Sequence, residues 1–255
     1  MEAQRKQQIE EAFNAIFRLI GIRGFATVAR WSYGKEELQL TKTPPLGEFV
    51  NNDEKQKVKC ASEFIREDIL KKFSFSKLIV DNDKEIGFHF KPGCRNEIQP
   101  QKCEDLVWME ISLAKIDDTF CKQLLKDLKG QGLTKYDGRD LKCVNKSYIK
   151  ETLNSAILGP FKKGIKNICF IPIQSPSRLK KIIGILAVNT ISEVDFFKLA
   201  NILQPFISGI ISPFHIEEVD YLRWCASMRQ AIAAIMARNM SHNIGSHAIW
   251  HLAEG

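Results

Sequence analysis

The stretch that decides the fold is "NICFIPIQSPSRLKKIIGILAVNTISEVDFFKLANILQPFISGII", which runs from Asn167 to Ile211. Its first half holds two β-rich runs, Asn167–Gln174 and Lys181–Thr190, joined by the turn "SPSRLK". This arrangement predicts a β-hairpin. Ser192 and Asp195 then resemble a capping box and predict a long helix that begins at Ser192. A hairpin followed by a long helix indicates the α+β fold class.

Apolar residues at helical spacing predict four more helices upstream of the hairpin. Each has a recognisable end, either an Asp or Ser that can cap the first turn or a glycine that stops the last one. The predicted helices are Gln7–Ile22, Ser62–Phe73, Asp117–Gly130 and Lys146–Gly159, the last ending at Gly159-Pro160.

Residues with high β-propensity predict further strands in the same region. The polar segment Lys91–Glu104 is rich in proline and glycine signals and predicts a loop. The predicted strands are Phe25–Tyr33, which pairs with Leu38–Lys42; Lys77–Val80 and Lys84–Phe90 on either side of an Asp-Asn-Asp turn; and Asp105–Ile116.

Composition excludes several classes of protein. With 255 residues, 44% of them apolar, the chain is long enough to bury a core. The charged amino terminus does not resemble a secretory signal, and Lys198, Asn201, Gln204 and Pro205 interrupt the apolar stretch 196–214. We therefore expect a cytoplasmic protein without a membrane span.

The charged and sulfur-containing residues point to no metal and no nucleic acid. The seven cysteines form no C-x-x-C pair, which predicts free thiols, and Cys94 and Cys103 have only His89 nearby. The net charge of +7 comes from scattered basic residues, of which "FKKGIK" and "RLKK" are the densest groups. Solvated loops explain them better than a nucleic-acid surface, so a nucleic-acid-binding regulator is a third, less favoured interpretation.

The order of the elements, and "FIPIQ", "IIGILAVNT" and "DFFKLANILQPF" in particular, resembles the end of a GAF domain. The resemblance implies a sensory domain over residues 1–211, with a sheet, flanking helices on one side of it and a pocket for a small-molecule ligand. It identifies no ligand-binding residue. Trp108 or His89 could line a pocket, and a packed aromatic side chain and a hydrogen-bonded sheet histidine are the alternatives.

The carboxyl-terminal segment 216–255 has a seam, a row of residues at helical spacing, whose polarity changes along its length. Its first half is apolar and its second half polar, and a purely structural seam avoids unpaired buried polar groups. The polar half therefore indicates a site. The seam residues, three or four apart, are Cys225, Met228, Ile232, Ile235, Asn239, His242, Ser246 and Ile249.

Around this site, "ARNMSHNIGSHAI" resembles the phosphoacceptor box of sensor histidine kinases. The resemblance implies that His242 accepts phosphate, that Asn243 occupies the position of the neighbouring acidic or amide residue, and that Ser246 occupies the phosphatase position. A neutral imidazole is a competent nucleophile for a γ-phosphoryl group. Asn243 can accept a hydrogen bond but cannot act as a base, whereas the Ser246 hydroxyl could orient a water.

Two other interpretations of these histidines stay open. His247 and His251 lie four residues apart and could hold a metal, but apart from Glu254 no nearby acidic or thiol group completes a ligand set. We therefore expect exposed histidines and no metal. For His242, the structural alternative is a polar residue that sets the register of a helical bundle.

No Walker A sequence and no glycine-rich ATP-binding sequence occurs in these residues. The resemblance therefore implies that ATP and Mg²⁺ bind a catalytic domain that this chain does not contain, and that the chain is the amino-terminal part of a longer kinase. The expected function is the sensory and phosphoacceptor portion of a two-component signalling kinase, a homodimer that transfers phosphate to the receiver domain of a response regulator. The alternative is a stand-alone GAF-like ligand-binding or interaction protein that dimerises through its last helix.

Overall fold

A computed structural model gives the fold. It describes residues 2–31, 38–64, 78–79, 82, 84–103, 106–136, 138–174, 182–195, 199–203, 226–234, 236–238 and 240–241. The chain divides into two compact units, Met1–Ile210 and Ile211–Gly255. We refer to them as the first unit and the second unit.

A seven-stranded mixed sheet forms the centre of the first unit, with the order β2-β1-β9-β8-β3-β5-β4. All neighbouring strands are antiparallel except β3 and β5, which are parallel. The strands are β1 (Gly24–Trp31), β2 (Leu38–Lys42), β3 (Ile86–Pro92), β4 (Glu97–Cys103), β5 (Leu106–Leu113), β8 (Asn167–Gln174) and β9 (Ile182–Thr190). The short strands β6 (Lys135–Tyr136) and β7 (Arg139–Asp140) pair separately.

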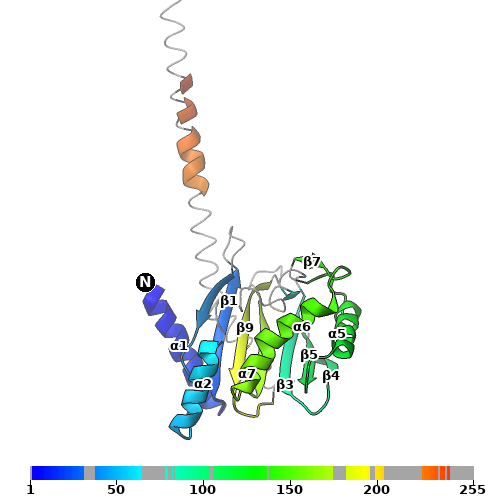
Figure 1. The fold of residues 1–255 in the computed structure, drawn as a ribbon. Coiled ribbons are helices and arrows are strands. Elements are labelled where there is room, and N and C mark those ends of the chain that lie inside the picture. The colour runs from blue at the N-terminus through cyan, green and yellow to red at the C-terminus, as the bar shows by residue number, and fades with distance from the viewer. Residues whose placement is uncertain are drawn as a thin grey trace, which may run out of the picture. The chain divides into compact units, whose positions relative to one another are not determined.

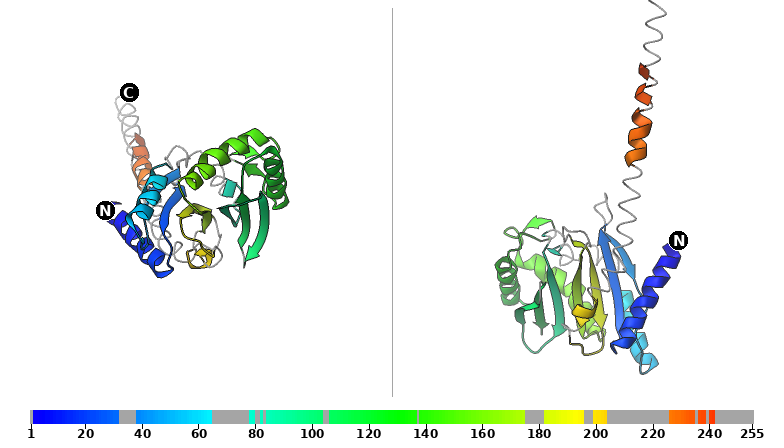
Figure 2. Two further views of the ribbon diagram at one scale, coloured as in Figure 1. Left: turned by 60° about the horizontal axis from the view of Figure 1, so that its bottom comes forward. Right: turned by 180° about the vertical axis from the view of Figure 1, so that it is seen from behind.

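Helices lie on both sides of the sheet. Figure 1 shows α2 (Asn52–Phe64), α5 (Asp118–Gly130), α6 (Lys146–Leu153) and α7 (Gly159–Lys162) in front of the strands. The rear view in Figure 2 shows α1 (Glu2–Leu19) on the other side. The central strands β8 and β9 are buried almost throughout, which agrees with their continuous apolar sequences.

The main core lies between the sheet and the front helices. Phe88, Phe90 and Phe170 project from β3 and β8 into a cluster that also contains Leu124 of α5 and Ile149 of α6. Because successive side chains of a strand point to opposite faces, His89 between the two phenylalanines points to the rear face. The fold thus places a histidine on the side of the sheet away from α5 and α6.

The α+β fold class and most of the predicted elements are confirmed. The opening helix, the β1–β2 pair, the β8–β9 hairpin, β3 and β5 lie where the sequence predicts them. The cap of α5 is also as predicted, since the Asp117 carboxylate accepts a hydrogen bond from the Phe120 N–H at 2.7 Å. The α5 helix then ends at Gly130.

Two predictions of helix boundaries are wrong for reasons of capping. Helix α2 begins ten residues before Ser62, where the Asn51 side chain accepts a hydrogen bond from the Glu54 N–H at 2.9 Å. Ser192 does not begin the last helix, because its hydroxyl accepts a hydrogen bond from the Arg23 backbone N–H at 2.9 Å. The Leu199 N–H of the helical stretch 199–203 donates to the Asp195 carbonyl. At α2 a second polar residue nearby, Asn51, therefore supplies the helix cap.

A third boundary is wrong at Gly159-Pro160. The chain passes from α6 through a π-helical turn, η1 (Asn154–Leu158), directly into α7. Pro160 lies in the first turn of α7, directly after the π-helical turn. The proline therefore does not stop the helical run at this point.

Two predictions of element type are also wrong. Leu78 and Ile79 are helical and fully buried, contrary to the predicted strand, because a short apolar run does not distinguish the two. The predicted loop 91–104 contains β4, which lies at the sheet edge and pairs with β5 alone among the described strands. An edge strand tolerates Pro100 and polar side chains, since its outer side needs no ladder of hydrogen bonds.

Candidate functional site

The residues predicted to carry the chemistry, His242, Asn243 and Ser246, lie outside the described residues, as do His247 and His251. In the second unit the structure describes 226–234, 236–238 and 240–241, all of them helical. The helical stretch thus reaches Ser241, the residue directly before His242.

Every described side chain of this stretch is exposed, including four large apolar ones. Met228 is 45% exposed, Ile232 52%, Met236 61% and Met240 63%. Residues four apart lie on the same side of a helix, so these side chains form one continuous row, which we call the apolar row. The described part of this helix therefore exposes a run of large apolar side chains.

In the first unit, a pocket of about 540 Å³ opens on the rear face of the sheet around His89. Its residues come from the end of β3, from β5, from the start of β8 and from the segment after β9. The lining residues are His89, Lys91, Pro92, Glu110, Lys166, Asn167, Glu193, Val194 and Asp195. We call it the His89 pocket.

His89 lines this pocket and is 3% exposed. Its Nδ1 lies 3.3 Å from Glu110 Oε2, and its Nε2 lies 3.0 Å from Asn167 Oδ1. The Lys91 ammonium binds the other carboxylate oxygen of Glu110. Strand register explains the arrangement, because His89 lies directly opposite Glu110 on β5.

A chain of hydrogen bonds continues from the pocket across the sheet. Asn167 donates to the Thr190 hydroxyl at 3.2 Å and to the Ser192 carbonyl at 2.8 Å. The Ser192 hydroxyl accepts from Arg23, whose guanidinium pairs with Glu54 of α2. Side chains of four strands and one helix are thereby connected, from Lys91 on β3 to Glu54 on α2.

The surroundings of Glu110 and Cys169 determine the charge of each of these two side chains. The hydrogen bond from His89, and then those from Lys91, lower the pKa of Glu110 to about 2 against the opposing effect of burial, so this carboxyl is ionised. Cys169 faces His89 across the β3–β8 pair, but burial, with a smaller effect of Glu110, raises the pKa of its thiol well above the usual value. A buried, protonated thiol is not a nucleophile, so a cysteine–histidine mechanism does not fit.

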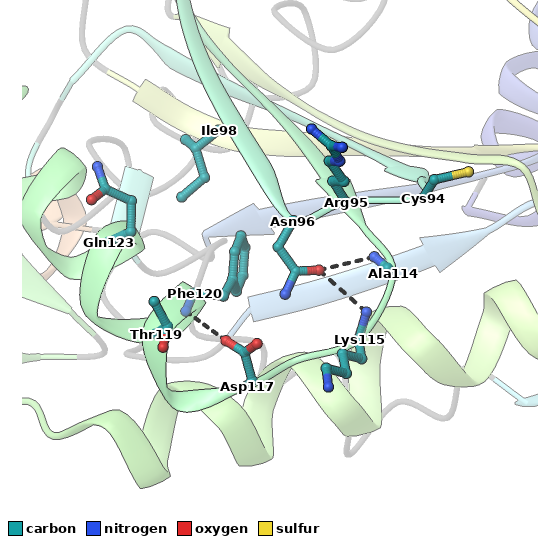
Figure 3. A pocket seen from close by; sticks show the side chains of 10 residues that line it. All are labelled: Cys94, Arg95, Asn96, Ile98, Ala114, Lys115, Asp117, Thr119, Phe120 and Gln123. Atoms are coloured by element: carbon teal, nitrogen blue, oxygen red, sulfur yellow. Dashed lines mark hydrogen bonds between the residues drawn. The ribbon is translucent and has the colours of Figure 1, made fainter.

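A second pocket of about 560 Å³ lies where the β3–β4 connection passes the end of β5, near the start of α5. Figure 3 shows Asn96 accepting hydrogen bonds from the backbone N–H groups of Ala114 and Lys115, beside Phe120. Cys94 lines this pocket without a histidine. In the described part of the chain, no group of three or more His, Cys, Asp or Glu side chains could hold a metal ion.

The two residues singled out for a sensory pocket have different positions. Trp108 is 1% exposed, and its ring packs against Gly87, so it corresponds to the alternative of a packed aromatic side chain. His89 is both hydrogen-bonded within the sheet and part of a pocket lining. Its partners Glu110 and Asn167 were not predicted, although a charged residue inside the apolar strand "LVWMEISL" was a visible signal.

No described helix is long and apolar enough to cross a membrane. Comparison of the chain with protein families, with curated proteins and with solved structures found no match.

Proposed function

We propose that this chain is the sensory and phosphoacceptor portion of a histidine kinase. In this proposal the first unit detects a signal, and the second unit dimerises and presents His242 to an ATP-binding domain that lies outside these 255 residues. A response regulator then takes the phosphate from His242. Cytoplasmic location is part of the same proposal.

The observation that carries the proposal is the apolar row, which runs directly into the Ser241-His242 pair. A phosphoacceptor histidine must lie on a helix that pairs with a second helix, so that a kinase domain finds it in a fixed position. Met228, Ile232, Met236 and Met240 offer such a pairing surface, and each is more than two-fifths exposed. A helix that served only as a solvated linker has no need of four large apolar side chains at this spacing.

The first unit supports a sensory role of the GAF type. Its central β8–β9 hairpin and the antiparallel pairing of that hairpin with β1 and β3 support the resemblance. Helix α1 on the rear side departs from the one-sided helix layer that the resemblance implies. The His89 pocket offers room for a small polar molecule. Its lining includes Glu193 and Asp195, which lie in the segment between β9 and the helical stretch 199–203.

The proposed chemistry is a phosphoryl transfer. A ring nitrogen of neutral His242 attacks the γ-phosphorus of ATP, an N–P bond forms, the bond to the β–γ bridging oxygen breaks, and ADP leaves with that oxygen. Mg²⁺ bound with the ATP neutralises the developing charge. Asn243 orients the imidazole by accepting a hydrogen bond, and the attacking ring's displaced proton goes to solvent because an amide is no base.

Ser246 has the proposed role of limiting the lifetime of the phosphohistidine. Four residues rotate by about 40° around a helix, so if the helix continues to Ser246 its hydroxyl is expected on the same side as the His242 ring. There it can orient a water toward the phosphorus. Ser246→Ala should preserve labelling and slow the loss of phosphate.

The test is to join the chain at Gly255 to the second phosphoacceptor helix and ATP-binding domain of a histidine kinase and to supply γ-labelled ATP. Acid-labile label should appear, and His242→Ala should abolish it. His247→Ala and His251→Ala are matched controls that should keep most of it, since those side chains point about 140° and 180° away around the helix. Label that persists in His242→Ala would overturn the assignment.

The same experiment separates the alternative function. A chain that dimerises through the apolar row but takes no label, in a fusion whose ATP-binding domain binds nucleotide, would be a stand-alone ligand-binding or interaction protein. The His89 pocket would then be its functional site.

A further inference from the structure

The pocket near the start of α5 carries an inference that concerns the first unit alone and does not depend on phosphorylation of His242. It has a volume of about 560 Å³ and lies between the β3–β4 connection, the residues that follow β5 and the first turns of α5. Asn96 joins the first two of these segments, and we call the cavity the Asn96 pocket. The orientation of Asn96, the charge of the lining and its apolar part together indicate one class of ligand.

The Asn96 side chain has a fixed orientation and offers hydrogen-bond donors to the pocket. Its Oδ1 accepts from the backbone N–H groups of Ala114 and Lys115 at 3.0 and 3.2 Å. A backbone N–H can only donate, so the amide oxygen must lie on that side and the amide nitrogen on the other. Figure 3 shows Nδ2 turned away from the two backbone N–H groups and toward Phe120. No described residue accepts a hydrogen bond from this nitrogen, so its N–H groups are available to a ligand.

The charged groups among the described lining residues are two cations and one carboxylate. The side chains of Arg95 and Lys115 are exposed and form no ion pair or hydrogen bond with any described residue. The Asp117 carboxylate already caps α5, because it accepts a hydrogen bond from the Phe120 N–H. The lining thus has an excess of one positive charge, and both cations are available to bind an anion.

The rest of the lining includes apolar side chains. Ile98 of β4 is half-buried, Ala114 is exposed, and Phe120 of α5 is 4% exposed. Figure 3 shows Ile98 and Phe120 on the same side of Asn96, whereas the Cys94 thiol points away from all three. A ligand that donates nothing and has an apolar part therefore suits this pocket better than a fully polar one.

We propose that the Asn96 pocket binds a small organic carboxylate whose body is apolar. The carboxylate oxygens accept hydrogen bonds from Asn96 Nδ2, and Arg95 and Lys115 compensate the negative charge. The apolar body covers Ile98 and the accessible part of Phe120, which removes apolar surface from water. An organic ammonium ion would meet two cations and a single carboxylate that is already engaged. Inorganic phosphate would leave the apolar side chains uncovered.

The test is a titration of the ¹⁵N-labelled full chain, followed by nuclear magnetic resonance. The probes are phenylacetate and hexanoate, which are carboxylates with an aromatic and an aliphatic body. At least one of them should shift the side-chain amide signals of Asn96 and the backbone amide signals of Ala114 and Lys115, with a Kd below about 1 mM. The neutral amides of the same shape, phenylacetamide and hexanamide, should bind at least about tenfold more weakly, and so should inorganic phosphate.

Three results of this titration would overturn the proposal. The first is that neither carboxylate shifts these signals at concentrations up to about 10 mM. The second is equal affinity for a carboxylate and its neutral amide, which would mean that the charge is not recognised. The third is equal affinity for inorganic phosphate, which would mean a contact for anions in general.

The variant Asn96→Asp distinguishes the two ends of the side-chain amide. Its carboxylate can still accept from the backbone N–H groups of Ala114 and Lys115, but a negatively charged oxygen replaces the free N–H groups and repels the ligand. The Kd of the bound carboxylate should rise at least about tenfold. Asn51→Asp is the matched control, because Asn51 accepts from the Glu54 backbone N–H at 2.9 Å and does not line the pocket. The Kd of this control should stay within about twofold of the unmodified chain.

The variant Lys115→Gln removes one cation and keeps the backbone N–H that donates to Asn96. It should raise the Kd about threefold or more, which is the effect of one exposed charge pair. Lys122→Gln is its control, since Lys122 is an exposed lysine of α5 that does not line the pocket. A carboxylate that binds Asn96→Asp or Lys115→Gln as tightly as it binds the matched control would contradict the proposed site.

Discussion

Two buried threonines of the first unit have hydroxyl groups in opposite situations. The Thr43 hydroxyl accepts a hydrogen bond from the Ala26 backbone N–H at 3.0 Å, whereas the Thr27 hydroxyl, buried on β1, has no hydrogen-bond partner among the described residues. Thr43→Val should lower the free energy of unfolding by about 1–3 kcal/mol, because it leaves a buried N–H unpaired. Thr27→Val should leave it unchanged or raise it by up to about 1 kcal/mol.

Urea unfolding of the two variants measures this difference directly. The substitutions are the same in shape, so each serves as the control for the other. A larger loss for Thr27→Val than for Thr43→Val would contradict the hydrogen bonds described for these two side chains.

Glu110 makes the stability of the first unit depend on acid pH. Its pKa is lowered from 4.5 to about 2 in the folded chain, so its ionised form stabilises the fold fully above about pH 4.5. This contribution, on the order of 3 kcal/mol, is lost as the pH falls through about 2. The difference in unfolding free energy between the unmodified chain and Glu110→Gln should shrink accordingly.

Urea unfolding at a series of pH values between about 5 and about 2 checks this, since the range spans both pKa values. Glu193→Gln, which removes an exposed carboxylate, controls for the change in net charge. A constant difference over the whole range would show that His89 and Lys91 do not stabilise the carboxylate.

Strand β3 depends on a glycine where β5 presses a large ring against it. A Cβ atom on Gly87 would lie 1.7 Å from Trp108 Cζ3, whereas a Cβ on Gly130, at the end of α5, would meet no described atom within 4 Å. Gly87→Ala should lower the unfolding free energy by about 1–3 kcal/mol or more, because the buried ring has no space to move. Gly130→Ala should be neutral or raise it by up to about 1 kcal/mol.

Thermal or urea unfolding of the two glycine variants decides the matter. Equal stability would mean that Trp108 does not lie over Gly87. That result would also remove the reason for a glycine inside a buried strand.

Elements with one strong local signal were predictable from the sequence, and elements that depend on their neighbours were not. The apolar runs of β8 and β9 and the capped, amphipathic α5 show their structure in their own residues. Strand β4, with the sequence "EIQPQKC", has no such local pattern, because only its pairing with β5 makes it a strand. The local sequence also gives no sign that β3 and β5 pair in parallel. The chain first forms β4 at the edge of the sheet and then places β5 between β3 and β4.

The candidate site was predictable to a similar extent. His89 was named as a possible pocket residue, but its partners come from positions 110 and 167, far away along the chain. The pairing of three strands brings them together, and single-sequence reasoning does not supply that pairing. The predicted residues His242, Asn243 and Ser246 lie outside the described residues, so their roles stay predictions.

The apolar row should make the whole chain self-associate. Replacing Ile232 and Met236 by lysine places two charges in the row and should convert a dimer to a monomer at about 50 µM. Ser227→Lys with Ala234→Lys adds the same charge at exposed positions roughly opposite on the helix and should leave the dimer intact.

Sedimentation velocity distinguishes these states. An unmodified chain that is monomeric at this concentration, or a dimer that survives the substitutions at Ile232 and Met236, would contradict pairing through the apolar row. Either result would also remove the main support for a phosphoacceptor helix at this end of the chain.

The central claim, that His242 accepts phosphate, is tested most directly by locating the phosphate itself. The chain joined to an ATP-binding domain is incubated with ATP and kept at neutral or alkaline pH, and the peptide that spans Asn239–His251 is fragmented in a mass spectrometer under conditions that preserve the N–P bond. The account predicts phosphate on His242 and none on His247 or His251. Phosphate on either of the other two histidines, or on none of the three in a fusion that binds ATP, would contradict it.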